Sequence, residues 1–382
     1  MKILVIANGY PDEREPQWGC FEKDQAVALA NFGHQVSIMY VDGRFRLHWR
    51  CIGINKKNFH NYSVYQIFYL PLGWLKFNLT YKIYYYAVKR MLKKLYKEYC
   101  KDNGIPDVIY AHYIWNIAYA TSLKEIDRTP LVGIEHWSGM TSPTLSIIAK
   151  FYGDIAYSNA DTLLAVSQSL QTQIKRHFGK DSTVVYDMLG QEFITPKVLK
   201  REVDDKFTFV AVGSLIHRKG FDVLISAYAK SNLASKGCRV IIVGEGPEKN
   251  RLENQTNEFG ISDYVSLVGR KTKEEIIRIM MKSHAFVLSS RAETFGVVCI
   301  EALSQGLPNI ATVCGGPEEF INDKNGLLIP TEDIDAMAEA MCKMYENYSQ
   351  YDNAAIANEC LGKFSPQVIA SQLTEIFNEV TN

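Results

Sequence analysis

The sequence lacks an excess of either charge, because 42 lysines and arginines balance 42 aspartates and glutamates in 382 residues. A neutral chain has no general electrostatic attraction to nucleic acid, so we expect no nucleic-acid partner. No run of 18 apolar residues is present, which excludes the usual membrane-spanning helix. The first residues become polar too soon for a secretory signal. We therefore expect a cytoplasmic protein.

Paired cysteines and a dinucleotide fingerprint are also missing. The eight cysteines are scattered and form no C-x-x-C pair, so neither a zinc site nor a disulfide framework is indicated. The turn after the first apolar run reads Ala-Asn-Gly-Tyr-Pro, where a dehydrogenase would have G-x-G-x-x-G. The sequence thus gives no support for a nicotinamide cofactor.

What the chain does have is a repeated alternation of short β-rich runs with helical patterns, which predicts an α/β fold with parallel sheets. The pattern restarts with a fresh apolar strand at residues 207–212. We therefore predict two doubly wound, Rossmann-like domains, 1–190 and 191–363, followed by an amphipathic helix at 364–382. The predicted strands are residues 2–7, 35–40, 64–69, 107–111, 131–135, 162–166, 183–186, 207–212, 239–243, 265–268, 285–289, 309–312 and 326–329.

The most informative segment is residues 291–308, in which two carboxylates, Glu293 and Glu301, bracket seven residues. A short apolar strand precedes Glu293, and a helical pattern that contains Glu301 follows it. We expect the backbone amides of Thr294, Phe295 and Gly296 to open this helix and to attract phosphate. Carboxylates beside an anion site suit a ligand that has both phosphates and hydroxyls, such as a sugar nucleotide.

This segment, Glu-Thr-Phe-Gly followed by Glu-Ala-Leu-Ser-Gln-Gly-Leu-Pro, resembles the retaining nucleotide-sugar glycosyltransferases of family 4, which carry the E-x7-E signature. The resemblance implies the GT-B fold, with two Rossmann-like domains facing a central cleft. The first domain would bind the acceptor, the second would bind the donor, and the last helix would cross back to the first. It further implies no cofactor and no metal requirement.

Other loops match the donor site of this family residue by residue. Gly19 matches a glycine that approaches the donor diphosphate, although a plain surface loop would look the same. Lys219 matches the lysine that holds phosphate. Ser214 stands where the family usually has arginine, and the adjacent Arg218 either supplies the missing guanidinium or is a solvated turn charge.

The resemblance also implies roles for several further residues. The backbone around Val268 and Arg270 would meet the base, Glu301 the ribose hydroxyls, and Glu293 the hydroxyls of the donor sugar. His136, which follows a predicted strand, would contact the donor sugar and its phosphate; a structural histidine is the alternative. His112 ends the preceding strand and either shapes the acceptor side or is a satisfied core residue.

Two features have competing interpretations. Asp333 and Asp335 form a D-x-D pair, a metal signature in another glycosyltransferase fold, but they precede a helical pattern, and we expect a helix cap. Residues 61–101 are rich in tyrosine and lysine. They form either an interfacial helix that contacts a membrane peripherally or a core-packed helix with a solvated lysine face.

The resemblance therefore implies a retaining hexosyltransferase. It would move a sugar from a nucleoside diphosphate to an acceptor hydroxyl on a glycan or lipid-linked saccharide, as in polysaccharide biosynthesis. The implied location is the cytoplasm, at the inner face of the membrane. A sugar-nucleotide 2-epimerase of the same fold is the enzyme alternative. The non-enzyme alternative is a non-catalytic sugar-nucleotide-binding module, because Ser214 replaces the usual arginine.

Overall fold

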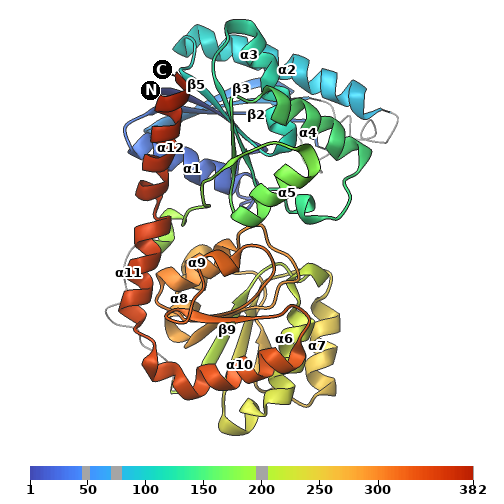
Figure 1. The fold of residues 1–382 in the computed structure, drawn as a ribbon, viewed down its shortest axis with the longest axis vertical. Helices are drawn as coiled ribbons and strands as arrows, with labels where there is room; N and C mark the ends of the chain where they lie inside the picture. The colour runs from blue at the N-terminus through green and yellow to red at the C-terminus, as the bar shows by residue number, and fades with distance from the viewer. Residues whose placement is uncertain (45–51, 70–79, 195–204, 382) are drawn as a thin grey trace. The chain divides into compact units, whose positions relative to one another are not determined.

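A computed structural model describes residues 1–44, 52–69, 80–194 and 205–381, which form two compact units (Figure 1). The first unit is Met1–Tyr186 with Pro366–Asn382, and the second is Asp187–Ser365. Residues 70–79 of the tyrosine- and lysine-rich stretch lie outside the described residues, as do residues 195–204 near the start of the second predicted domain.

The first unit is built on an eight-stranded sheet with the order β3-β4-β2-β1-β5-β6-β7-β8. Each pair of neighbours is parallel except β3 and β4, which are antiparallel. The prediction of purely parallel sheets was wrong at this edge. The strands are β1 Lys2–Ile6, β2 Gln35–Asp42, β3 Gly53–Asn58, β4 Tyr62–Phe68, β5 Val108–His112, β6 Leu131–Glu135, β7 Thr162–Ala165 and β8 Thr183–Val184.

Helices cover both faces of this sheet, so its central strands are buried along their length, as an apolar parallel strand requires. Helix α1 packs against α12, and α3 packs against α2 and α4. The helices of this unit are α1 Cys20–Asn31, α2 Tyr81–Asn103, α3 Ile114–Asp127, α4 Ile147–Asn159, α5 Gln168–Phe178 and α12 Pro366–Thr381.

The last helix is part of the first unit although it ends the chain. Phe377 of α12 is fully buried, and its ring meets that of Tyr110 on β5 at a centroid distance of 5.2 Å. Thr374 of the same helix is bonded to the ring of His34. Pro366 opens this helix, and a proline at that position has no amide to leave unpaired.

The second unit has a six-stranded, wholly parallel sheet with the order β11-β10-β9-β12-β13-β14. The strands are β9 Thr208–Val212, β10 Arg239–Val243, β11 Val265–Leu267, β12 Ala285–Leu288, β13 Asn309–Thr312 and β14 Gly326–Ile329. The helices are α6 Phe221–Ser231, α7 Lys249–Glu258, α8 Lys273–Lys282, α9 Val297–Ser304, α10 Ile334–Asn347 and α11 Asn353–Phe364.

Each sheet has one place where the strand order reverses direction. In the second unit this place lies between β9 and β12, and in the first unit between β1 and β5. Loops leave the carboxyl ends of those two strands in opposite directions, and α/β folds commonly bind ligands in the crevice at this position. In the described part of the chain, no helix has the length and apolar character needed to cross a membrane.

Candidate functional site

The strand reversal of the second unit brings together two predicted site residues that lie 74 positions apart. Lys219 ends the short 3-10 turn after β9 (η5, His217–Lys219), and Glu293 lies in the loop after β12. The Lys219 ammonium lies 2.5 Å from Oε1 of Glu293, and both side chains are largely buried. The ion pair therefore joins the two loops that border the crevice.

Glu293 is held in place by further contacts. Its backbone N–H donates to the carbonyl of Cys314 at 2.9 Å, and Oε1 also accepts from the Ser290 hydroxyl at 2.6 Å. Oε2 accepts from no residue in the described ranges. The carboxylate is thus fixed through one oxygen, and the other oxygen is left for a ligand.

The loop that carries Lys219 is tied to the β12 loop through its backbone. The amide of Arg291 donates to the carbonyl of Arg218 at 2.8 Å, and the Ser289 hydroxyl donates to the carbonyl of Lys219 at 2.9 Å. The Arg291 guanidinium donates to the carbonyl of His217. It also donates to the two carboxylate oxygens of Asp222, at 3.0 Å to each oxygen.

The Arg291 side chain also pairs with Glu332, so one guanidinium serves two carboxylates. Burial alone would raise the pKa of Asp222, but the hydrogen bonds from Arg291 lower it below its ordinary value. Asp222 therefore stays ionised, and a bidentate pair of this kind fixes orientation as well as charge. The interaction positions the Lys219 loop.

Glycines allow these loops to approach closely. Gly220 has φ 62°, and a Cβ there would lie 2.0 Å from the carbonyl oxygen of Ser289. Gly244, after β10, has φ 152°, and a Cβ there would lie 1.8 Å from the carbonyl oxygen of Gly213. Any side chain at either position would push apart backbone segments that border the crevice.

Helix α9 begins directly after Gly296, where the helical pattern of the sequence also begins. Gly296 is its N-cap, with φ 93°, and the helix starts at Val297. Of the three residues that we expected to open the helix, Gly296 does so as the N-cap, and Thr294 and Phe295 precede it. These three residues form the turn that leads into α9. Among the described residues, the amides of Thr294 and Gly296 have no acceptor.

The remaining predicted residues of this unit surround the same sheet edge. The exposed residue Ser214 and the half-buried residue Arg218 lie in the loop after β9, and no described residue pairs with the Arg218 guanidinium. Val268 and Arg270 follow β11, where the Val268 amide donates to Ile242 at 3.0 Å. Half-buried Glu301 lies within α9. Asp333 caps α10 by accepting from the amide of Ala336, which confirms the predicted cap.

In the first unit, Gly19 precedes α1 with φ 74°. A Cβ at this position would lie 2.3 Å from the carbonyl oxygen of Gly9, so the two ends of the loop after β1 touch through their backbones. Position 19 therefore needs a glycine, because the backbones at Gly9 and Gly19 approach each other closely. A plain surface loop does not impose this constraint.

His136 follows β6 and contacts His112 at the end of β5. Nε2 of His136 lies 3.1 Å from Nδ1 of His112, and the two rings are parallel. His112 is fully buried, and its Nε2 has no partner in the described residues. Burial and the neighbouring His136 hold the pKa of His112 well below its ordinary value. His112 is therefore neutral near pH 7.

Sequence reasoning missed the residue that orients His136. The buried carboxylate of Glu135 accepts from the amides of His136 and Trp137, at 2.9 and 2.7 Å, and from the Tyr157 hydroxyl at 2.5 Å. Burial raises the pKa of Glu135, although these hydrogen bonds oppose the rise. Tyr113, beside His136, has φ 68°, a strained backbone conformation that non-glycine residues keep mainly at functional sites.

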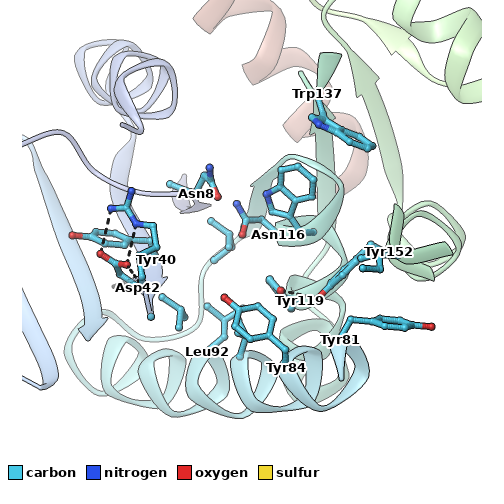
Figure 2. Close-up of a pocket in the computed structure, with 18 of the residues that line it drawn as sticks. Asn8, Tyr40, Asp42, Tyr81, Tyr84, Leu92, Asn116, Tyr119, Trp137 and Tyr152 are labelled. Atoms are coloured by element: carbon cyan, nitrogen blue, oxygen red, sulfur yellow. Dashed lines mark hydrogen bonds and ion pairs between the residues drawn. The ribbon is translucent and has the colours of Figure 1, made fainter. Parts of the chain in front are cut away.

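The strand reversal of the first unit holds a cavity of about 630 Å³ (Figure 2). The ends of β1 and β2 line one side, and α2, α3 and α4 supply the rest. Tyrosine and tryptophan dominate the lining, including Tyr40, Tyr84, Tyr119 and Tyr152. No sequence motif marks this cavity. The sequence also did not single out Arg291, Asp222 and Glu135, because arginine, aspartate and glutamate are too common for one of them to stand out.

The close contact at Gly220 gives a stability prediction. Alanine in the left-handed region costs about 1–2 kcal/mol, and Gly260→Ala shows this cost alone because Gly260 has φ 65° and nothing within 4 Å. Gly220→Ala should lose a further roughly 1–3 kcal/mol, because the Ser289 carbonyl must move. Urea unfolding followed by circular dichroism measures both. Equal losses in the two variants would contradict the contact.

The buried His112 gives a pH prediction. Its folded pKa lies below the unfolded value of 6.5, so the unfolded chain binds more protons, and stability falls as pH drops below 6.5. For one titrating group, the free energy of unfolding falls by at most about 1.4 kcal/mol per pH unit. His112→Gln should reduce this loss, whereas exposed His60→Gln should not. All five tryptophans lie at or before Trp137, so their fluorescence reports on the first unit. Identical pH profiles for the two variants would rule the explanation out.

Comparisons with known proteins agree in both units. The family model for family 4 glycosyltransferases matches residues 23–187, and the model for glycosyl transferases group 1 matches residues 195–359. A glycosyltransferase of Bacillus subtilis that is provisionally assigned to teichuronic acid biosynthesis, TuaC, is 26% identical over 368 residues, which cover 91% of this chain and 90% of that protein.

Solved structures are similar over the whole chain. Sucrose-phosphate synthase from Thermosynechococcus elongatus has a TM-score of 0.78 and 18% identity, and the match covers 99% of this chain and 98% of that one. Anabaena Alr3699/HepE in complex with UDP and glucose has a TM-score of 0.74 and 19% identity, with 99% of each chain covered. The fold of the chain is GT-B, and the two family matches indicate that it is a glycosyltransferase of the group 1, family 4 type.

Proposed function

We propose that the chain transfers a sugar from a nucleoside-diphosphate sugar to an acceptor hydroxyl, with retention of anomeric configuration. The observation that carries the proposal is the Lys219–Glu293 ion pair at the strand reversal of the second unit. It brings a phosphate-binding cation and a hydroxyl-binding carboxylate to the edge where α/β sheets bind ligands. A sugar nucleotide needs both groups.

The pair leaves capacity for such a ligand. The Lys219 ammonium has three N–H donors and gives one to Glu293, so the others can reach phosphate oxygens. The second oxygen of the Glu293 carboxylate can accept from a sugar hydroxyl. The leaving diphosphate gains charge as the glycosidic bond breaks, and a fixed cation stabilises that charge more in the transition state than in the ground state.

Other groups fit the same ligand. The turn before α9 offers the amides of Thr294 and Gly296 to a phosphate, and Arg218 supplies a second cation. The resemblance assigns the ribose to Glu301, the base to the backbone around Val268, and the donor sugar to His136. It describes front-face attack, in which the leaving phosphate takes the proton of the acceptor hydroxyl. We propose no metal and no cofactor.

The comparisons support this choice of substrates. The Anabaena protein was solved with UDP and glucose bound. The name of the Bacillus relative places it provisionally in teichuronic acid biosynthesis. We infer a role in polysaccharide biosynthesis for this chain, with a glycan or a lipid-linked saccharide as the acceptor.

The first test of the proposal removes the pair. Lys219→Ala and Glu293→Ala should each lower turnover of the correct nucleotide sugar by about two orders of magnitude, because each removes one strong transition-state contact. Exposed Lys282→Ala is the matched control and should keep wild-type turnover. Release of nucleotide in the presence of acceptor is the measurement.

A buried charge left alone destabilises a protein by about 3–5 kcal/mol, so a single variant can fail by unfolding. The double variant Lys219→Met with Glu293→Leu removes both charges and should fold without turnover. Wild-type rates in either single variant would remove the site assignment. Nucleotide release without acceptor would support the epimerase alternative, and donor binding without release would support a binding module.

Helix α2 supports a peripheral membrane contact, which we propose at the inner face of the membrane. Ile83 and Tyr86 are 59% and 64% exposed, and the exposed Arg90, Lys94 and Lys97 continue the same face at helical spacing. Two other lysines of this helix are already paired, because both Lys89 and Lys93 contact Glu125. An exposed face of basic and apolar residues suits an anionic lipid surface.

This proposal predicts different effects for the two sets of basic residues on α2. Changing Arg90, Lys94 and Lys97 to glutamine should weaken binding to phosphatidylserine vesicles, at about 1 kcal/mol per residue. Changing Lys89 and Lys93 to glutamine should have a smaller effect, because Glu125 already neutralises part of their charge. Co-sedimentation measures both. Unchanged binding in the triple variant would exclude the contact.

A further inference from the structure

The cavity at the strand reversal of the first unit has an apolar chemistry that the donor site does not share. It encloses about 630 Å³, and eight of its 21 described lining residues are tyrosine or tryptophan. Figure 2 shows Tyr84 and Leu92 of α2 facing Tyr119 and Asn116 of α3, with Tyr152 of α4 at one side. A volume of this size holds a ligand of drug-like dimensions.

Of the tyrosines in the described lining, all but Tyr81 have a hydroxyl that is engaged with another side chain. Tyr119 and Tyr152 bond to each other at 3.0 Å, and Tyr84 accepts from Tyr69 at 3.3 Å. The Tyr40 hydroxyl donates to Gln66. The cavity therefore receives mainly the rings of these residues, which are apolar, and few of their hydrogen-bonding groups.

The charged group of the lining is also neutralised. Arg44 pairs with Asp42 and Glu15, at 3.1 Å to each, and its guanidinium lies 3.0 Å from the centre of the Trp18 ring. Two carboxylates and an aromatic face satisfy this cation without a ligand. A free charge therefore does not define what the cavity binds.

Among the buried polar side-chain groups of the described lining, one has no partner. Asn116 is 7% exposed, and its amide nitrogen Nδ2 bonds to no residue in the described ranges. An unsatisfied buried donor destabilises the folded protein by about 1–3 kcal/mol unless a ligand supplies the acceptor. Asn116 lies in the first turn of α3, directly after β5, where the sheet reversal places ligands.

We propose that this cavity binds a hydrocarbon aglycone of the acceptor, and that the Asn116 amide bonds the polar atom at the head of that chain. The proposal rests on the proposed function, since it names the acceptor class for that transfer. A saccharide in this space would lose water from many hydroxyls, and each loss is unfavourable without a new partner. One free amide and a wall of aromatic rings match a hydrocarbon with one polar head.

Helix α2 connects this cavity to the proposed membrane contact. Tyr81, Tyr84, Val88 and Leu92 follow one another at helical spacing and line the cavity. The exposed face of the same helix carries Ile83, Tyr86 and Arg90. A helix that touches lipid on one face and a cavity on another suits an acceptor with a hydrocarbon chain.

The test uses n-alkyl β-glucosides from butyl to octyl as probes, below their micelle concentrations and without any nucleotide. Trp18, Trp115 and Trp137 line the cavity, so tryptophan fluorescence should report binding. Affinity should rise about fourfold per added methylene, which is the value of burying that group in an apolar site. Glucose and maltose should not bind. Equal affinity for all chain lengths, or tight binding of maltose, would overturn the proposal.

Variants of two lining residues test the contacts of the polar head and of the hydrocarbon chain separately. Asn116→Leu should weaken octyl glucoside binding by roughly three- to tenfold, the value of one hydrogen bond, while the gain per methylene persists. Its melting temperature should not fall, because no existing hydrogen bond is lost. Tyr84→Ala should reduce the affinity for octyl glucoside, and Phe259→Ala, an aromatic residue that is 47% exposed on the second unit, should not. Unchanged binding in both Asn116→Leu and Tyr84→Ala would place the ligand elsewhere.

These experiments are independent of the proposed transfer. If the alkyl glucosides bind as described and no nucleotide sugar is turned over, the proposed function fails while the hydrocarbon site stands. If turnover is observed and the alkyl glucosides do not bind, the hydrocarbon site fails while the transfer stands.

Discussion

The ion pair between Lys219 and Glu293 is the interaction on which the account of the donor site depends. Two opposite charges taken out of water are stable together only when hydrogen bonds hold them in good geometry. The second unit supplies these bonds through Ser290, through the backbone of Cys314, and through Arg291, which ties the two loops together. The sheet order then places the pair at the edge where an α/β fold binds ligands.

The two units use the same topology for different chemistry. Each has a strand reversal, with loops that leave the carboxyl ends of adjacent strands in opposite directions. In the second unit that position holds an ion pair and open backbone amides, which suit a charged ligand. In the first unit it holds an aromatic cavity with one unsatisfied buried amide, Asn116, and nearby the buried His112 in contact with the half-buried His136. The division between donor and acceptor that we propose thus rests on the side chains.

The sequence was informative where local rules apply. The apolar runs marked most of the strands, and the cap at Asp333 followed from its position before a helical pattern. The polar strand β3 was missed because an edge strand needs little apolar character. Arg291 with Asp222, and Glu135 with Tyr157, could not be predicted, because such pairs depend on tertiary proximity between distant residues.

The most direct test of the central claim is a crystal structure with a nucleoside-diphosphate sugar bound. The account predicts the diphosphate within hydrogen-bond distance of the Lys219 ammonium, beside the turn that leads into α9, with a sugar hydroxyl on the Glu293 carboxylate. A diphosphate bound elsewhere on the second unit, with the Lys219–Glu293 pair undisturbed and out of contact, would contradict it.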